Sequence, residues 1–80
     1  VEEENTNILI YPNPADNEIT IIAKEKINEI NIFDITGKLC LKQSNNTNNI
    51  NINCEQLAKG IYTIHVFNFN KKTIRKLFIK

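Results

Sequence analysis

The chain has 80 residues and a net charge of +1, with ten basic and nine acidic side chains. This length fits one small domain, and the nearly neutral charge argues against a dedicated nucleic-acid binder. No apolar run approaches the roughly 18–20 residues of a transmembrane helix, and the first residues do not have the pattern of a secretory signal peptide. Isoleucine and asparagine together supply 29 residues, which favours strands joined by polar turns over a helical bundle.

Seven short apolar or alternating segments follow one another along the chain, with turn-forming residues between them. Their ranges are 8–11, 18–23, 29–34, 38–42, 50–53, 62–66 and 73–79. Strands that begin every 10–12 residues or so are typical of an all-β sandwich or barrel. No helical periodicity competes with this pattern, so the sequence predicts a single all-β domain of about seven antiparallel strands.

The connections between these segments have recognisable turn chemistry. Residues 24–26 are predicted to form a charged turn, and residues 44–48 a polar loop. Asp34–Gly37 fits a hairpin turn because Asp stands first and Gly fourth. Residues 54–57 are predicted to form a single helical turn, with Gly60 as its C-terminal cap.

Tyr11-Pro12-Asn13-Pro14 is the most unusual local sequence in the chain. Each proline fixes φ and removes a backbone donor, and each pushes the residue before it toward an extended conformation. The tetrapeptide therefore lies at a sheet edge or outside the sheet. Taken alone, its simplest role is to end a strand and protect an edge.

Further motifs follow this one in a fixed order. Ile10–Ile21 contains the two prolines together with Asp16-Asn17. Ile32-Phe33-Asp34 then leads into Gly37-Lys38. Leu57–Tyr62 contains Gly60-Ile61-Tyr62, and a basic strand ends the chain. This ordered set resembles the C-terminal sorting domain, type A, of the type IX (Por) secretion system in Bacteroidota. The resemblance covers residues 8–80.

The resemblance implies a fold, a function and a set of recognition residues. The fold is an immunoglobulin-like antiparallel β-sandwich of about seven strands. The function is that of an address, read by the type IX translocon and its shuttle proteins, with no catalytic residue and no cofactor. The residues that match the family motifs are Tyr11, Pro12, Asn13, Pro14, Asp16, Asn17, Gly37, Lys38, Gly60, Tyr62, Lys71, Lys72, Arg75 and Lys76.

The resemblance also implies a route for the protein. Residues 1–7 are expected to be a linker from an upstream cargo domain, and residues 8–80 the sorting domain. Cargo of this kind passes through the periplasm to the cell surface or medium. A surface cysteine peptidase, a sortase, typically cuts the linker, and in many members the cargo is joined to an anionic lipopolysaccharide. Deleting residues 71–80, or replacing Pro12 and Pro14, is predicted to leave the cargo in the periplasm.

The cysteines and the single histidine are the candidates for chemistry. Alternation along the strands places Cys54 inward and Cys40 outward, which favours two free thiols over a disulfide, and these cysteines depart from the family pattern. His65 is expected on the wetter face of its strand. With Cys40 it makes a poor catalytic dyad, and the three side chains lack the spacing of a zinc site. We therefore expect neither an enzyme nor a metal site.

The last part of the chain is strongly basic. Residues 1–40 carry eight acidic and three basic side chains, whereas residues 41–80 carry one and seven, and no acidic residue follows Glu55. The basic strand either discourages edge-to-edge aggregation or steers the domain toward an acidic receptor. An edge-strand dimer is a further option. The alternative functions are a small immunoglobulin-like module that binds carbohydrate or protein in an extracellular enzyme, and a structural spacer.

Overall fold

The computed structural model describes residues 8–69 and 71–80. Five strands form in this part of the chain, and all their pairings are antiparallel. They are β1 (Ile8–Tyr11), β2 (Glu18–Asp34), β3 (Leu39–Asn53), β4 (Gly60–Asn68) and β5 (Lys71–Ile79). None of the described residues belongs to a helix long and apolar enough to span a membrane. The all-β prediction is confirmed.

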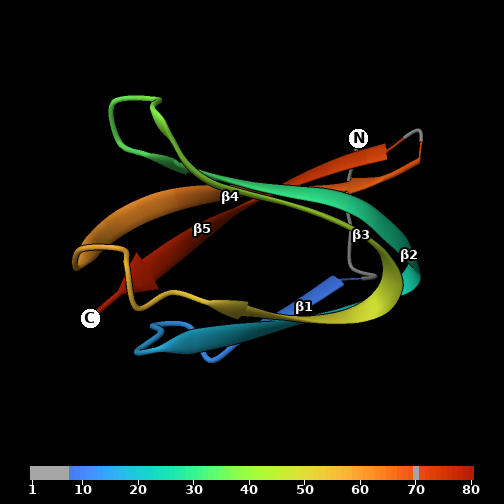
Figure 1. Ribbon diagram of the computed structural model, residues 1–80, viewed down its shortest axis with the longest axis horizontal. Coiled ribbons are helices and arrows are strands. Elements are labelled where there is room, and N and C mark those ends of the chain that lie inside the picture. Colours follow the sequence, from blue (N-terminus) through green and yellow to red (C-terminus); the bar gives the residue numbers. More distant parts are fainter. Residues whose placement is uncertain (1–7, 70) are drawn as a thin grey trace.

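The strand number differs from the prediction because two pairs of expected strands are continuous. β2 covers the predicted segments 18–23 and 29–34, and β3 covers 39–42 of the predicted segment 38–42 together with 50–53. Each long strand bends and contributes to two layers (Figure 1). One layer holds β1, the first part of β2 and the last part of β3; the other holds the first part of β3, the last part of β2, β4 and β5. The arrangement is consistent with the expected immunoglobulin-like sandwich.

The two layers enclose a core made mainly of isoleucine. Inward-facing residues alternate along each strand, as in Ile19, Ile21 and Ala23 of β2. The fully buried or nearly buried hydrophobic residues are Ile8, Ala15, Ile19, Ile21, Ala23, Ile27, Ile30, Ile32, Ile50, Ile52, Cys54, Tyr62, Ile64, Val66, Leu77 and Ile79. β-branched side chains pack well between pleated layers, so the isoleucine-rich composition has a direct structural use.

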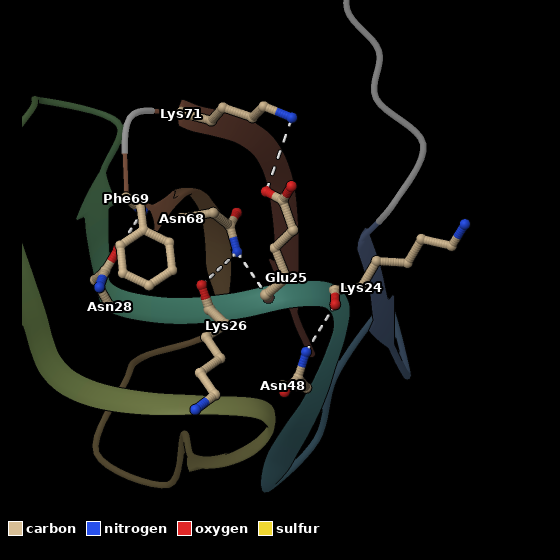
Figure 2. Close-up of polar contacts among 8 residues, drawn as sticks. All are labelled: Lys24, Glu25, Lys26, Asn28, Asn48, Asn68, Phe69 and Lys71. Atoms are coloured by element: carbon tan, nitrogen blue, oxygen red, sulfur yellow. Dashed lines mark hydrogen bonds and ion pairs between the residues drawn. The ribbon is translucent and has the colours of Figure 1, made fainter.

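Asparagine side chains stabilise the bend of β2. The Nδ2 group of buried Asn68 donates to the carbonyl oxygens of Glu25 and Lys26, both at 3.0 Å (Figure 2). The Nδ2 group of Asn48 donates to the carbonyl oxygen of Lys24 at 2.8 Å (Figure 2). These carbonyls lie where β2 changes layers, and side-chain amides serve as their partners. The predicted turn at 24–26 and the loop at 44–48 were therefore wrong: both segments are strand, bent at this point.

The hairpin between β4 and β5 lies against the same bend. The backbone N–H of Phe69 donates to Oδ1 of Asn28, and the Lys71 ammonium lies 3.8 Å from the Glu25 carboxylate (Figure 2). Phe69 has a positive φ of 55°, a conformation that few non-glycine residues adopt. This hairpin and the bend together close one end of the sandwich.

The remaining turns mostly follow the sequence. Gly37 donates its N–H to the carbonyl of Asp34 at 3.0 Å and has a φ of 91°, so the predicted hairpin is confirmed. Between β3 and β4, Leu57 donates to the Cys54 carbonyl at 3.0 Å in a single turn. Gly60, with a φ of 150°, opens β4 directly. The helix cap predicted there was wrong because the chain re-enters the sheet, where Gly60 pairs with Ile79.

Candidate recognition surface

The segment Tyr11–Asn17 connects β1 and β2 and reaches β5 in the opposite layer. Its two prolines lie outside the named strands and are exposed, as expected. Ala15 is fully buried; its N–H donates to the Phe78 carbonyl at 2.7 Å, and its carbonyl accepts from Lys80 N–H at 2.9 Å. These bonds form a parallel bridge with β5. The motif therefore protects part of an edge, the edge of the last strand.

Asn13 extends this contact through its side chain. Its Nδ2 group donates to the Lys76 carbonyl at 3.0 Å, and its Oδ1 accepts from the Phe78 N–H at 3.1 Å. The amide thus imitates the donor and acceptor of a neighbouring strand. An exposed ion pair between Lys80 and Asp16, at 3.8 Å, adds a weak contact.

A shallow apolar groove of about 300 Å³ lies beside this contact. It is open to solvent and lined by Pro14, Gly60, Ile61, Phe78, Ile79 and Lys80. Ile61 and Phe78 are 48% and 40% exposed, and Tyr11 is 46% exposed. The motif and the last strand consequently present a mixed apolar and basic surface.

The central hairpin lies at the same end of the sandwich. The Asp34 carboxylate accepts hydrogen bonds from the Thr36 N–H and hydroxyl at 2.9 and 2.6 Å and from the Lys38 N–H at 3.0 Å. These donors, the Thr36 hydroxyl first, lower the pKa of Asp34, because they favour the charged form. Gly37 and Lys38 are exposed at the tip.

Tyr62 is held inside the protein. Its hydroxyl donates to the Ala58 carbonyl at 2.6 Å, which ties the turn before β4 to the sheet. Burial raises the pKa of the Tyr62 hydroxyl, since a phenolate is disfavoured away from water. Tyr62 is therefore part of the core and not of the exposed surface, while Gly60 lines the groove.

The structure brings together most, but not all, of the residues expected from the sequence. The connections at 12–17, 34–38 and 54–59 and the end of β5 all lie at one end of the sandwich (Figure 1). Lys76 lies beside Asn13. Lys71 and Lys72 lie at the far end of β5, about 24–27 Å from Ile79 at the usual rise per residue. Arg75 is half-buried on the other face of the strand from Lys76.

The two cysteines and His65, the residues considered for chemistry, lie in different surroundings. The His65 ring packs on Phe33, with centroids 4.6 Å apart. Burial, and then the charge of Lys72, lower the pKa of His65. Cys54 is buried, which raises the pKa of its thiol, and Cys40 is exposed; both are free, as alternation predicted. Among the described residues, no three potential metal ligands cluster.

Three residues of this surface lie within the expected motif and last strand but were not singled out individually as recognition residues. Ala15, Phe78 and Lys80 make the backbone contacts that hold the motif on β5. The sequence signal for this contact was the small apolar residue Ala15 between Pro14 and Asp16, because only a small side chain fits where two backbones approach each other closely. Its partner strand could not be read from local sequence.

Comparison with known families identifies the kind of domain to which this chain belongs. The model of the secretion system C-terminal sorting domain matches residues 9–80. The chain belongs to this family. The family is the C-terminal sorting signal of proteins secreted by the type IX system, so the function expected from the sequence is confirmed. The sorting domain serves secretion across the outer membrane, and its family is not a catalytic one.

Solved structures support the fold of the sorting domain. One similar structure is PorZ, an essential bacterial surface component of the type IX secretion system of Porphyromonas gingivalis, with a TM-score of 0.73 and 21% identity. The match covers 91% of this chain and 11% of the PorZ chain, so the domain corresponds to a small part of that protein. The sulfur carrier protein SoxY from Chlorobium limicola f thiosulfatophilum matches with a TM-score of 0.53 and 15% identity, over 98% of this chain and 83% of that one. No curated protein matches the sequence.

Proposed function

We propose that the type IX machinery reads the sorting domain at one surface, formed by Tyr11–Asn17 and the last strand. One observation carries the proposal: the Asn13 side chain and the Ala15 backbone hold the motif against β5. Two segments that are far apart in the sequence thereby present their exposed side chains together. A receptor then recognises a folded surface and not a linear peptide.

The other motif residues have supporting parts in this proposal. Gly37 and Lys38 form the exposed hairpin tip at the same end. Gly60 lines the groove beside Pro14, and Tyr62 holds the turn before β4. The cations of β5 steer the domain toward an acidic receptor, because a positively charged patch raises the rate at which the domain meets a negatively charged partner.

We further propose the route that the family resemblance suggests. The domain lies at the end of a larger cargo, crosses the periplasm with shuttle proteins, and reaches the outer-membrane translocon. A surface cysteine peptidase then cuts in the linker at residues 1–7, which lie outside the described residues. The cargo remains attached to an anionic lipopolysaccharide or is released. None of these steps needs chemistry from the sorting domain itself.

A secretion assay tests the surface. Residues 1–80 are fused to a periplasm-targeted fluorescent protein in a bacterium with a working type IX system. The wild-type fusion should reach the surface or medium, and it should stay inside a translocon mutant. Tyr11→Ala with Asp16→Ala changes two exposed side chains of the surface and should strongly reduce export while the domain stays folded.

The matched control is Lys24→Ala with Asn46→Ala, two exposed positions at the bent end of the sandwich. This pair should be exported normally. Equal export of both pairs would place recognition elsewhere on the domain. A wild-type fusion that is folded but periplasmic in both strains would contradict the sorting function itself.

A further inference from the structure

The last strand has one edge that is only partly covered. β5 is the final strand of its layer and pairs with β4 on one side. On the other side, Asn13 and Ala15 contact residues 76–80. No described strand lies beside Lys71–Arg75 on that side. About five residues of edge, roughly 16 Å long at the usual strand rise, are thus open to pairing.

The orientation of the backbone along this edge follows from the bonds to the motif. Phe78 directs its N–H and carbonyl at Asn13 and Ala15, and Lys76 directs its carbonyl at Asn13. The pairing of β4 with β5 runs without a shift from Gly60 to Asn68. Because backbone groups alternate between the two sides of a strand, those of Lys72 and Ile74 also face the open side.

The side chains beside this edge define the chemistry of a partner. Lys72, Ile74 and Lys76 are exposed on the outer face of the sheet, and Ile74 is 51% exposed. Neither lysine has an acidic partner among the residues that the structure describes. A strand added here would place its own side chains directly opposite these three.

We propose that the open edge of β5 binds an extended acidic segment of a partner protein, which adds one strand to the sheet. Acidic side chains two positions on either side of an apolar one match Lys72, Ile74 and Lys76. A second copy of β5 fits poorly, because it would bring like charges together. Asn13 already binds the carbonyl of Lys76 and limits how far the added strand extends. The inference rests on the proposed recognition surface, because it assigns a binding partner to the part of the β5 edge that the motif leaves uncovered.

A peptide titration tests this assignment. The probe is acetyl-Thr-Glu-Thr-Ile-Thr-Glu-Thr-amide, added to the 80-residue chain labelled with ¹⁵N at low salt. We expect amide shifts and slower hydrogen exchange at Lys72, Ile74 and Lys76. Binding should weaken as salt rises, because exposed ion pairs are screened. The same peptide with lysine in place of glutamate should not bind.

Variants of the edge make the test specific. Ile74→Pro removes an N–H that faces the open side and leaves the bonds to β4 in place, a change that edge strands tolerate. This variant should abolish binding of the peptide. Ile74→Val keeps the N–H and should preserve binding. Lys72→Glu should weaken binding by roughly fivefold, from the loss of an attraction and the gain of a repulsion. Lys59→Glu, an equal charge change in the exposed turn before β4, should have little effect.

The outcomes separate this inference from the proposed function. Shifts centred on other strands, equal binding of the lysine peptide, or a concentration-dependent dimer through β5 would each overturn the strand-addition proposal. If the peptide fails to bind while Tyr11→Ala with Asp16→Ala still blocks export, the recognition surface stands and this assignment of its partner is wrong.

Discussion

Asn13 and Phe78 are 65 positions apart in the chain, yet the Asn13 side chain accepts the backbone N–H of Phe78 at 3.1 Å. The same amide donates to Lys76. One side chain therefore replaces a strand pair at the edge of β5. This relationship explains how a proline-flanked segment with few backbone donors can still cover a sheet edge.

Asn13→Ala should expose the edge at Phe78. Both side-chain hydrogen bonds are lost, and since each contributes about 1 kcal/mol, the free energy of unfolding should fall by about 1–2 kcal/mol. Hydrogen exchange at the Phe78 amide should accelerate. Asn17→Ala is the control, because the contact of Asn17 with Cys54 is through its backbone carbonyl. Unchanged exchange at Phe78 in Asn13→Ala would contradict the contact.

Asn68→Asp should destabilise the bend of β2. It replaces the amide that donates to Glu25 and Lys26 with a carboxylate facing two carbonyl oxygens. The expected loss is about 3 kcal/mol, because buried acceptors lose their donor. Urea unfolding measures it. Asn46→Asp, the same change at an exposed position, should alter stability by less than about 0.5 kcal/mol; equal losses would count against the role of Asn68.

Tyr62→Phe should loosen the turn before β4. The change removes only the hydroxyl that bonds to Ala58, so the free energy of unfolding should fall by about 1 kcal/mol. Tyr11→Phe is a matched control, since Tyr11 is exposed in the part of the chain that the structure describes. The urea midpoint of Tyr62→Phe should therefore drop while that of Tyr11→Phe stays near wild type. The reverse order would be inconsistent with this contact.

Asp34 should make stability depend on pH in the acid range. Its pKa in the folded state lies below the ordinary value of 3.8, so its interactions stabilise the fold above that value. This contribution is lost as the pH falls through the folded pKa. Asp34→Asn should therefore be less stable than wild type at pH 7, with a difference that shrinks in strong acid. Glu55→Gln, which removes another exposed carboxylate, should not reproduce this profile in urea unfolding.

His65 differs from Asp34 because the fold disfavours its charged form, yet both groups make the fold less stable as the pH falls. The folded pKa of His65 is below the ordinary 6.5, so the unfolded state binds more protons between the two values and stability falls as the pH is lowered through this window. Lys72→Gln removes the nearby positive charge, and an NMR titration should show the pKa of His65 rising toward 6.5. Because burial is the larger cause, part of the shift should remain; a lower pKa in this variant would contradict the assignment.

The local sequence predicted the strands well and their continuity poorly. The Asp34–Gly37 hairpin followed from two residues with strong turn preferences, and the inward and outward positions of Cys54 and Cys40 followed from alternation. The polar segments at 24–26 and 44–48 looked like loops because charged and asparagine residues favour turns. Their strand structure depends on amides contributed by Asn48 and Asn68, which no local pattern reveals.

The sequence by itself determined the class of the fold and the extended motif at Tyr11–Asn17, because β-branched alternation and proline chemistry act within a few residues. The family followed from the resemblance of the ordered motifs to those of known members. Only the tertiary structure decided that this motif lies on β5 and that, among the described residues, no strand covers the first half of the last edge. These features join residues more than 40 positions apart in the chain or depend on which strands pair, and contacts at such separation are specified by packing of the whole sandwich.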